Sequence, residues 1–104
     1  MDKQQVVVSK LSKYKELVSL SGIDIGAMYL FGSYAEGRAT NDSDIDVAIV
    51  SNDFSGSRYY DSLKLSKIRN AVDVAIEPIA YRTDDFIMED PLVSQILKTG
   101  IKIN

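Results

Sequence analysis

The sequence predicts a small α+β (α/β) fold, in which helices pack on a short mixed β-sheet. Some segments carry apolar residues at every third or fourth position, which predicts helices, and others are short continuous apolar runs bounded by turn residues, which predicts strands. These segments follow one another in the order helix, strand, strand, helix, strand, helix. The length of 104 residues fits one domain, residues 1–104.

The first half of the chain is predicted to contain one helix and two strands. Residues Val7–Leu20 have the apolar spacing of an amphipathic helix. Ile23–Phe31 reads as a buried strand, and Ser33–Thr40 has room for a short helical turn closed by Gly37. Ile45–Val50 is apolar nearly throughout, which is typical of a strand covered on both faces.

The second half is predicted to add a helix, a third strand and a short helical end. Its predicted elements are a helix over Ser57–Asn70, a strand over Ala71–Ile76 that Ile79–Tyr81 extends past Pro78, a helical piece over Asp85–Glu89 with an N-cap signal at Thr83, a helix over Pro91–Lys98, and a terminal strand or tail over Ile101–Ile103.

The composition excludes several kinds of chemistry. The chain has no cysteine and no histidine, so disulfides, thiolate metal sites, histidine bases and a Ser-His-Asp triad are ruled out. The remaining acid-base and metal-binding groups are carboxylates, whose hard oxygens suit magnesium or manganese. The net charge of −3 disfavours a protein that binds nucleic acid through phosphate contacts alone. Because no apolar run reaches the roughly 20 residues needed to span a bilayer, and the N-terminus lacks a signal-peptide pattern, we expect a cytoplasmic protein without a membrane segment.

One stretch, Leu30–Val50, carries the residues suited to chemistry. Asp44 and Asp46 are two positions apart at the start of a predicted strand, so their carboxylates face the same side while the apolar residues between them face the core. A bridging cation would relieve the repulsion between the two charges. By itself, Asp-x-Asp also fits the end of a solvated loop.

Gly32 and Ser33 follow the first predicted strand. Glycine allows a sharp turn and the close approach of a ligand, and amides and a hydroxyl at the start of a helical turn can hold phosphate oxygens. A third carboxylate on the third strand would complete a two-metal site. Asp73 and Glu77 are both candidates, because they lie four positions apart and would share a face of an unbroken strand.

Together, Gly32, Ser33, Ala35, Gly37, Ser43, Asp44, Ile45 and Asp46 resemble the signature of the polymerase-β-like nucleotidyltransferase superfamily. The small size is similar to its minimal members, including the antitoxin-type nucleotidyltransferases that pair with a helical HEPN-domain protein. The resemblance covers roughly residues 10–81.

The resemblance implies a role for each matching residue. Gly32 and Ser33, with Ser43 and Arg38, would bind the nucleoside triphosphate. Asp44 and Asp46 would bind two Mg²⁺ ions, with Mn²⁺ as a substitute. Asp73, as first choice, or Glu77 would contact the second metal and help to activate the attacking hydroxyl.

The implied activity is transfer of a nucleoside monophosphate, AMP from ATP in the first instance, to a protein or small molecule. The acceptor or partner would be a small HEPN-type protein, or the chain would form a homo-oligomer. The alternative is a catalytically silent module that neutralises a partner by docking. The intact set of carboxylates favours the enzyme.

Overall fold

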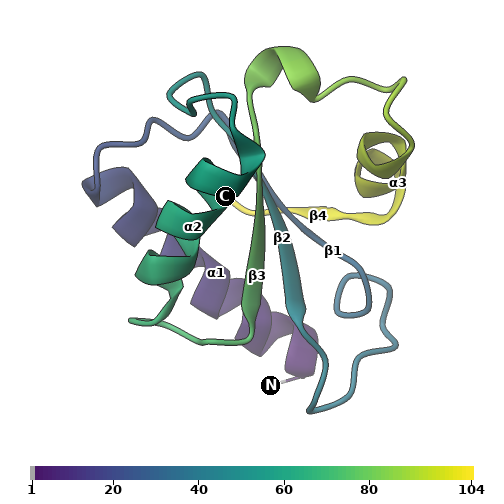
Figure 1. Ribbon diagram of the computed structural model, residues 1–104. Helices are drawn as coiled ribbons and strands as arrows, with labels where there is room; N and C mark the ends of the chain where they lie inside the picture. Colours follow the sequence, from purple (N-terminus) through teal and green to yellow (C-terminus); the bar gives the residue numbers. More distant parts are fainter. Residues whose placement is uncertain (1) are drawn as a thin grey trace.

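The computed structural model describes residues 2–104 and contains a four-stranded sheet with helices on both faces (Figure 1). The predicted α+β fold with a small mixed sheet is confirmed. Along the chain the elements are α1 (Lys3–Leu20), β1 (Ala27–Phe31), β2 (Ile45–Val50), α2 (Arg58–Arg69), β3 (Ile76–Tyr81), the 3-10 helix η1 (Thr83–Asp85), α3 (Pro91–Thr99) and β4 (Ile101–Lys102).

The sheet has the strand order β3-β2-β1-β4. β1 runs antiparallel to both β2 and β4, whereas β2 and β3 are parallel. A parallel pair needs a crossover connection, and α2 supplies it between β2 and β3. Because of these strand directions, the C-terminal end of β1 and the N-terminal ends of β2 and β3 lie at the same end of the sheet.

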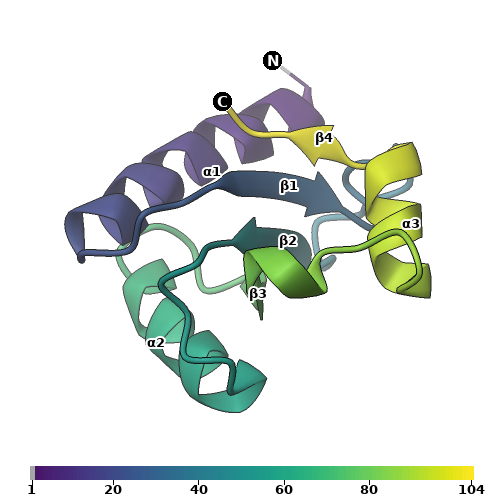
Figure 2. The same ribbon diagram turned by 90° about the horizontal axis from the view of Figure 1, so that it is seen from above.

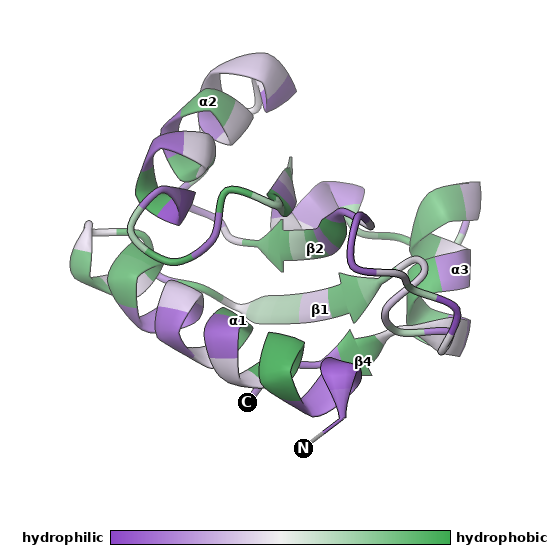
Figure 3. Cartoon of the chain, turned by 90° about the horizontal axis from the view of Figure 1, so that it is seen from below, coloured by the Kyte–Doolittle hydropathy of each residue, from purple (hydrophilic) through white to green (hydrophobic). Residues whose placement is uncertain are grey.

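The larger core lies between the sheet and the helices α1 and α2, which both cover the same face (Figure 2). α1 alternates between hydrophobic and hydrophilic residues along its length, as an amphipathic helix does (Figure 3). Tyr14 is fully buried on α1 and its hydroxyl donates a 2.7 Å hydrogen bond to the Leu65 carbonyl of α2. The two helices are therefore joined by a polar contact as well as by apolar packing.

The opposite face carries a smaller core beneath α3. Its fully buried members are Ala48, Val50, Tyr81, Val93 and Ile96. Asp90 begins α3 by accepting hydrogen bonds from the Leu92 and Val93 amides, with Pro91 at the first helical position. This helix lies toward one side of the sheet, at the end nearer β4 (Figure 1).

The predicted third strand is wrong in its first part, Ala71–Ile76, because β3 spans Ile76–Tyr81. Its predicted extension past Pro78 over Ile79–Tyr81 is confirmed. The preceding residues form turns: the Asp73 amide donates to Arg69 O, and the Ala75 amide donates to the Asp73 carboxylate. Pro78 lies within β3, where an edge strand tolerates the missing N–H.

The predicted helical piece over Asp85–Glu89 is also wrong. The chain forms the 3-10 turn η1 at Thr83–Asp85 instead, and Thr83 does not act as a side-chain N-cap. Across residues 2–104, the structure has no helix with the length and apolarity that crossing a membrane requires.

Candidate active site

The predicted site residues lie where β1 ends and β2 and β3 begin. In the sheet register, Asp46 of β2 is opposite Phe31 of β1 on one side and opposite Glu77 of β3 on the other. Directly paired residues point to the same face of a sheet. Asp46 and Glu77 are therefore neighbours on the face that α3 partly covers, while Ile45 and Val47 are buried in the larger core.

Gly32 is packed against the Asp46 carboxylate. Its φ of 75° lies in the left-handed region, and a Cβ added there would clash with Asp46 Oδ2. Both the backbone conformation and the lack of space therefore require glycine. The chain therefore leaves β1 in close contact with the Asp46 carboxylate of the neighbouring strand β2.

Residues 33–38 form the predicted short turn. The Glu36 amide donates to Gly32 O and the Arg38 amide to Ser33 O, each at 3.0 Å, and Gly37 has a φ of 76°. Ser33 is half-buried at the beginning of this turn. Arg38 is mostly exposed and lies 3.5 Å from Glu36 in an ion pair, so its guanidinium can move toward a ligand.

Asp46 is the electrostatic centre of the site. Burial raises the pKa of its carboxyl above the ordinary value of 3.8, and the negative charges of Asp44 and Glu77 raise it further. The positive charge of Arg38 acts in the opposite direction. These four side chains are therefore close enough to influence one another, and a bound cation would relieve the repulsion among the three carboxylates.

Asp73, the first choice for the third carboxylate, is engaged elsewhere. It lies in the turn before β3 and accepts a 2.7 Å hydrogen bond from Lys10 Nζ of α1. That hydrogen bond is the main reason that its pKa falls below 3.8, with a further contribution from the Ala75 amide. Together with Lys10 and Ser43, Asp73 lines a hollow of about 350 Å³ on the α1 side of the molecule.

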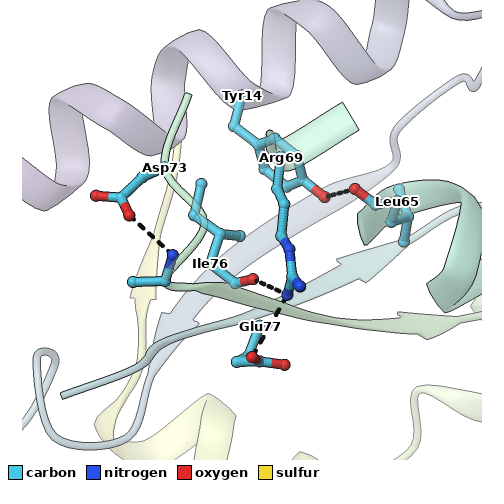
Figure 4. Close-up of polar contacts among 7 residues, drawn as sticks. Tyr14, Leu65, Arg69, Asp73, Ile76 and Glu77 are labelled. Carbon is cyan, nitrogen blue, oxygen red and sulfur yellow. Dashed lines mark hydrogen bonds and ion pairs between the residues drawn. The ribbon is translucent and has the colours of Figure 1, made fainter. Parts of the chain in front are cut away.

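Glu77, rather than Asp73, lies beside the Asp46 carboxylate. It is the register partner of Asp46, and its side chain is about half exposed. Asp73 points away from it (Figure 4). The prediction that Asp73 and Glu77 share a face does not hold, because two residues four apart do so only when one strand contains both, and Asp73 lies before β3.

Ser43 orders the connection that leads into the acidic pair. Its hydroxyl accepts a 2.9 Å hydrogen bond from the Thr40 amide, and its own amide donates to the Thr40 carbonyl. The turn therefore fixes the direction in which the chain enters Asp44.

Among residues 2–104, no three acidic side chains are clustered closely enough to hold a metal ion by themselves. The donor set still suits a hard cation. Asp44 and Glu77 each repel the Asp46 carboxylate, and all three side chains offer only carboxylate oxygens as ligands.

One neighbour of the site was not identified from the sequence. Arg69, in the last turn of α2, donates from Nη1 to the Ile76 carbonyl at 2.8 Å and lies 3.4 Å from Glu77 Oε1 (Figure 4). The available signal was a basic residue at the end of the helix that precedes the third strand.

Comparison with known proteins agrees with this fold. A family model described as "Nucleotidyltransferase domain" matches residues 11–103. No curated protein sequence matches the chain. Among solved structures, the chain is similar to a Sulfolobus solfataricus protein provisionally assigned as a nucleotidyltransferase, with a TM-score of 0.64 and 18% identity over 95% of this chain and 80% of that one.

The chain is also similar to a toxin-antitoxin structure determined with AMP-PNP, with a TM-score of 0.58 and 22% identity over 93% of this chain and 72% of that one. At these identities the two structures bear on the fold alone. The family model covers most of the chain and includes every predicted site residue, so the protein belongs to the nucleotidyltransferase domain family.

Proposed function

We propose that this chain is a Mg²⁺-dependent enzyme that transfers a nucleoside monophosphate, AMP from ATP, to a protein or small-molecule acceptor. Its family membership supports the reaction class. The observation that carries the proposal is the packing of Gly32 directly on Asp46, with Glu77 as the register partner of Asp46. The turn that follows β1 therefore lies directly against a carboxylate whose neighbours Asp44 and Glu77 repel it.

Asp44 and Asp46 would hold the metal ions, for which Mn²⁺ would also serve. When bound, two such ions stabilise the attacking and leaving oxygens of an in-line displacement. Mg²⁺ is commonly held by one or two carboxylates together with substrate phosphates. The nucleotide would therefore complete the coordination that the acidic side chains alone do not.

Gly32, Ser33 and Arg38 would contact the triphosphate. The positive charge of Arg38 already acts on Asp46, which supports a position within reach of phosphates bound there. The Ser43 hydroxyl is engaged with the Thr40 amide, so we assign Ser43 the role of ordering the turn beside the nucleotide.

Glu77 is our choice over Asp73 for the third carboxylate. It lies beside Asp46, whereas Asp73 is paired with Lys10 on the α1 side. Glu77 would contact the second metal ion. In the proposed reaction, the acceptor hydroxyl loses its proton to Glu77, its oxygen bonds to the α-phosphorus, and the bond to pyrophosphate breaks.

We further propose that residues 1–104 form one nucleotidyltransferase domain whose acceptor is a partner protein. The similarity to a toxin-antitoxin structure with an adenine nucleotide supports both ATP as donor and a protein partner. A small helical protein of the HEPN type is the specific candidate.

The test uses purified protein, Mg²⁺ and ATP labelled on the α-phosphate, with the co-expressed partner as acceptor. We expect label to appear on the acceptor and to be lost in the double variant Asp44→Ala with Asp46→Ala. The matched control is Asp42→Ala, which removes an exposed carboxylate from the same connection and should leave transfer intact. Equal labelling by the double variant would refute the assignment, and binding of the partner without labelling would support the silent docking module instead.

A further inference from the structure

Glu77 lies on an edge strand, and an edge strand leaves carbonyls without a partner in the sheet. The Ile76 carbonyl is instead bonded by Arg69 Nη1 at 2.8 Å. Arg69 therefore reaches from α2, on one face of the sheet, around the edge of β3 to the peptide that precedes Glu77 (Figure 4).

The same Nη1 atom lies 3.4 Å from Glu77 Oε1. One guanidinium group thus contacts both the backbone and the carboxylate at the beginning of β3. The contact is partly shielded, because the Arg69 side chain is 24% exposed and that of Glu77 is 52% exposed. Nη1 carries two N–H groups, so this one atom can donate to both acceptors. The flat guanidinium also fixes the directions of these donors, which the rotating ammonium of a lysine does not.

Arg69 is itself held in place by the packing behind the sheet. α2 is joined to α1 through the hydrogen bond from Tyr14 to Leu65, four residues before Arg69. The guanidinium thus extends from a packed helix rather than from a loop. Its contact with Glu77 therefore limits the movement of the Glu77 side chain.

We propose that Arg69 is a positioning residue that holds Glu77 beside Asp46, in position to join a divalent cation. This rests on the proposed role of Glu77 in metal binding. Arg69 also offsets the charge of Glu77, which lets a third carboxylate stand next to Asp44 and Asp46 before the cation arrives. Residues that orient a metal ligand without touching the metal commonly change metal affinity by about 10- to 100-fold when they are replaced.

The test is Mn²⁺ affinity, measured by titration calorimetry on the whole chain saturated with a non-hydrolysable ATP analogue, with the heat of Mn²⁺ binding to the analogue alone subtracted. We expect Arg69→Gln to weaken Mn²⁺ binding by about 10-fold and Arg69→Lys, which keeps the charge but not the fixed directions of the planar group's donors, to weaken it less. Lys67→Gln is the matched control, since it removes one exposed positive charge from the same turn of α2 and should change nothing. If Arg69→Gln fails to fold by circular dichroism, Arg69→Lys carries the test.

A cycle with Glu77→Gln separates a positioning role from a general structural one. If Arg69 acts through Glu77, adding Arg69→Gln to Glu77→Gln weakens Mn²⁺ binding no further. An undiminished effect in the Glu77→Gln background would overturn the proposal. So would tighter binding by Arg69→Gln alone, because Arg69 would then merely compete with the cation for Glu77. If Glu77→Gln leaves Mn²⁺ affinity unchanged while Asp44→Ala weakens it, the role of Glu77 is wrong and the inference fails with it, whereas the rest of the proposed site stands.

Discussion

The two faces of the sheet differ in how completely they are covered. The face under α1 and α2 holds most of the buried apolar side chains, and its one buried tyrosine hydroxyl is hydrogen-bonded. The other face has a smaller core under α3, and beyond it the uncovered end of the sheet carries Asp46 and Glu77. Most of the stabilising core thus lies on one face and the proposed site on the other, and the strands alternate between the faces residue by residue.

Asp73 and Glu77 show the same division at a single strand end. Asp73 is satisfied by Lys10 and by the Ala75 amide, which is what a stabilising carboxylate needs. Glu77 is half exposed, has Arg69 as its one side-chain partner among the described residues, at 3.4 Å, and stands beside the Asp46 carboxylate, where a cation could bind. The difference teaches that the acidic group with fewer satisfied contacts is the better candidate for function.

The largest expected effect tests the covered face. Leu11→Ala should lower the free energy of unfolding by about 2–5 kcal/mol, because it leaves a cavity among fully buried neighbours. Urea unfolding measures this, and Leu20→Ala, at a position 76% exposed on the same helix, is the control with an expected change within about 0.5 kcal/mol. A similar loss at both positions would contradict the packing described for α1.

The next effect separates Asp73 from Glu77. Asp73→Asn should cost about 0.5–1 kcal/mol at neutral pH, a modest value because Lys10 is 41% exposed, and should leave nucleotidyl transfer intact. Glu77→Gln should remove most of the nucleotidyl transfer and change the free energy of unfolding little. Urea unfolding and the labelling assay measure the two quantities.

The pH dependence provides a check on the same pair. The pKa of Asp73 is lowered in the folded state, so its contribution is fully present above 3.8 and is lost as the pH falls through the folded value. The difference in stability between the wild type and Asp73→Asn should therefore shrink below pH 3.8. A difference that stays constant across this range would show that the Lys10 contact is not electrostatic in origin.

Much of the site was predictable from the sequence because its parts are local. The two-residue spacing of Asp44 and Asp46 places both carboxylates at one strand end, and Gly32 stands directly after a strand. The choice between Asp73 and Glu77 was not predictable in the same way. The alternating valines Val72 and Val74 have the pattern of a strand, but Val74 is 68% exposed in a turn. Lys10, the partner of Asp73, lies 63 residues away in the chain, so local sequence does not reveal the contact.

The contact between Arg69 and Glu77 is even harder to predict, because it depends on features of the whole sheet rather than on neighbouring residues. It exists because β3 is both parallel to β2 and at the edge of the sheet. Strand order and register arise from the packing of the whole chain, so residue types and spacing do not determine them.

The last expected effect on stability is no larger than that of Asp73→Asn, and it has the opposite sign. Because burial and two neighbouring carboxylates raise the pKa of Asp46 in the folded state, its charge opposes folding at neutral pH. Asp46→Asn should therefore stabilise the protein by about 0.5–1 kcal/mol, which in a chain of this size raises the midpoint of thermal unfolding by about 2–8 °C. Thermal unfolding at pH 7 measures the change, with Asp42→Asn as the exposed control.

The gain from Asp46→Asn should diminish as the pH falls toward 3.8, since the wild-type carboxyl then becomes protonated and loses the charge that opposes folding. Mg²⁺ should narrow the same gap at pH 7, because a cation that binds Asp46 stabilises only the wild type. A variant that melts at or below the wild-type midpoint at pH 7 would show that Asp46 contributes to packing, and the division between a stabilising face and a functional face would no longer hold at its central residue.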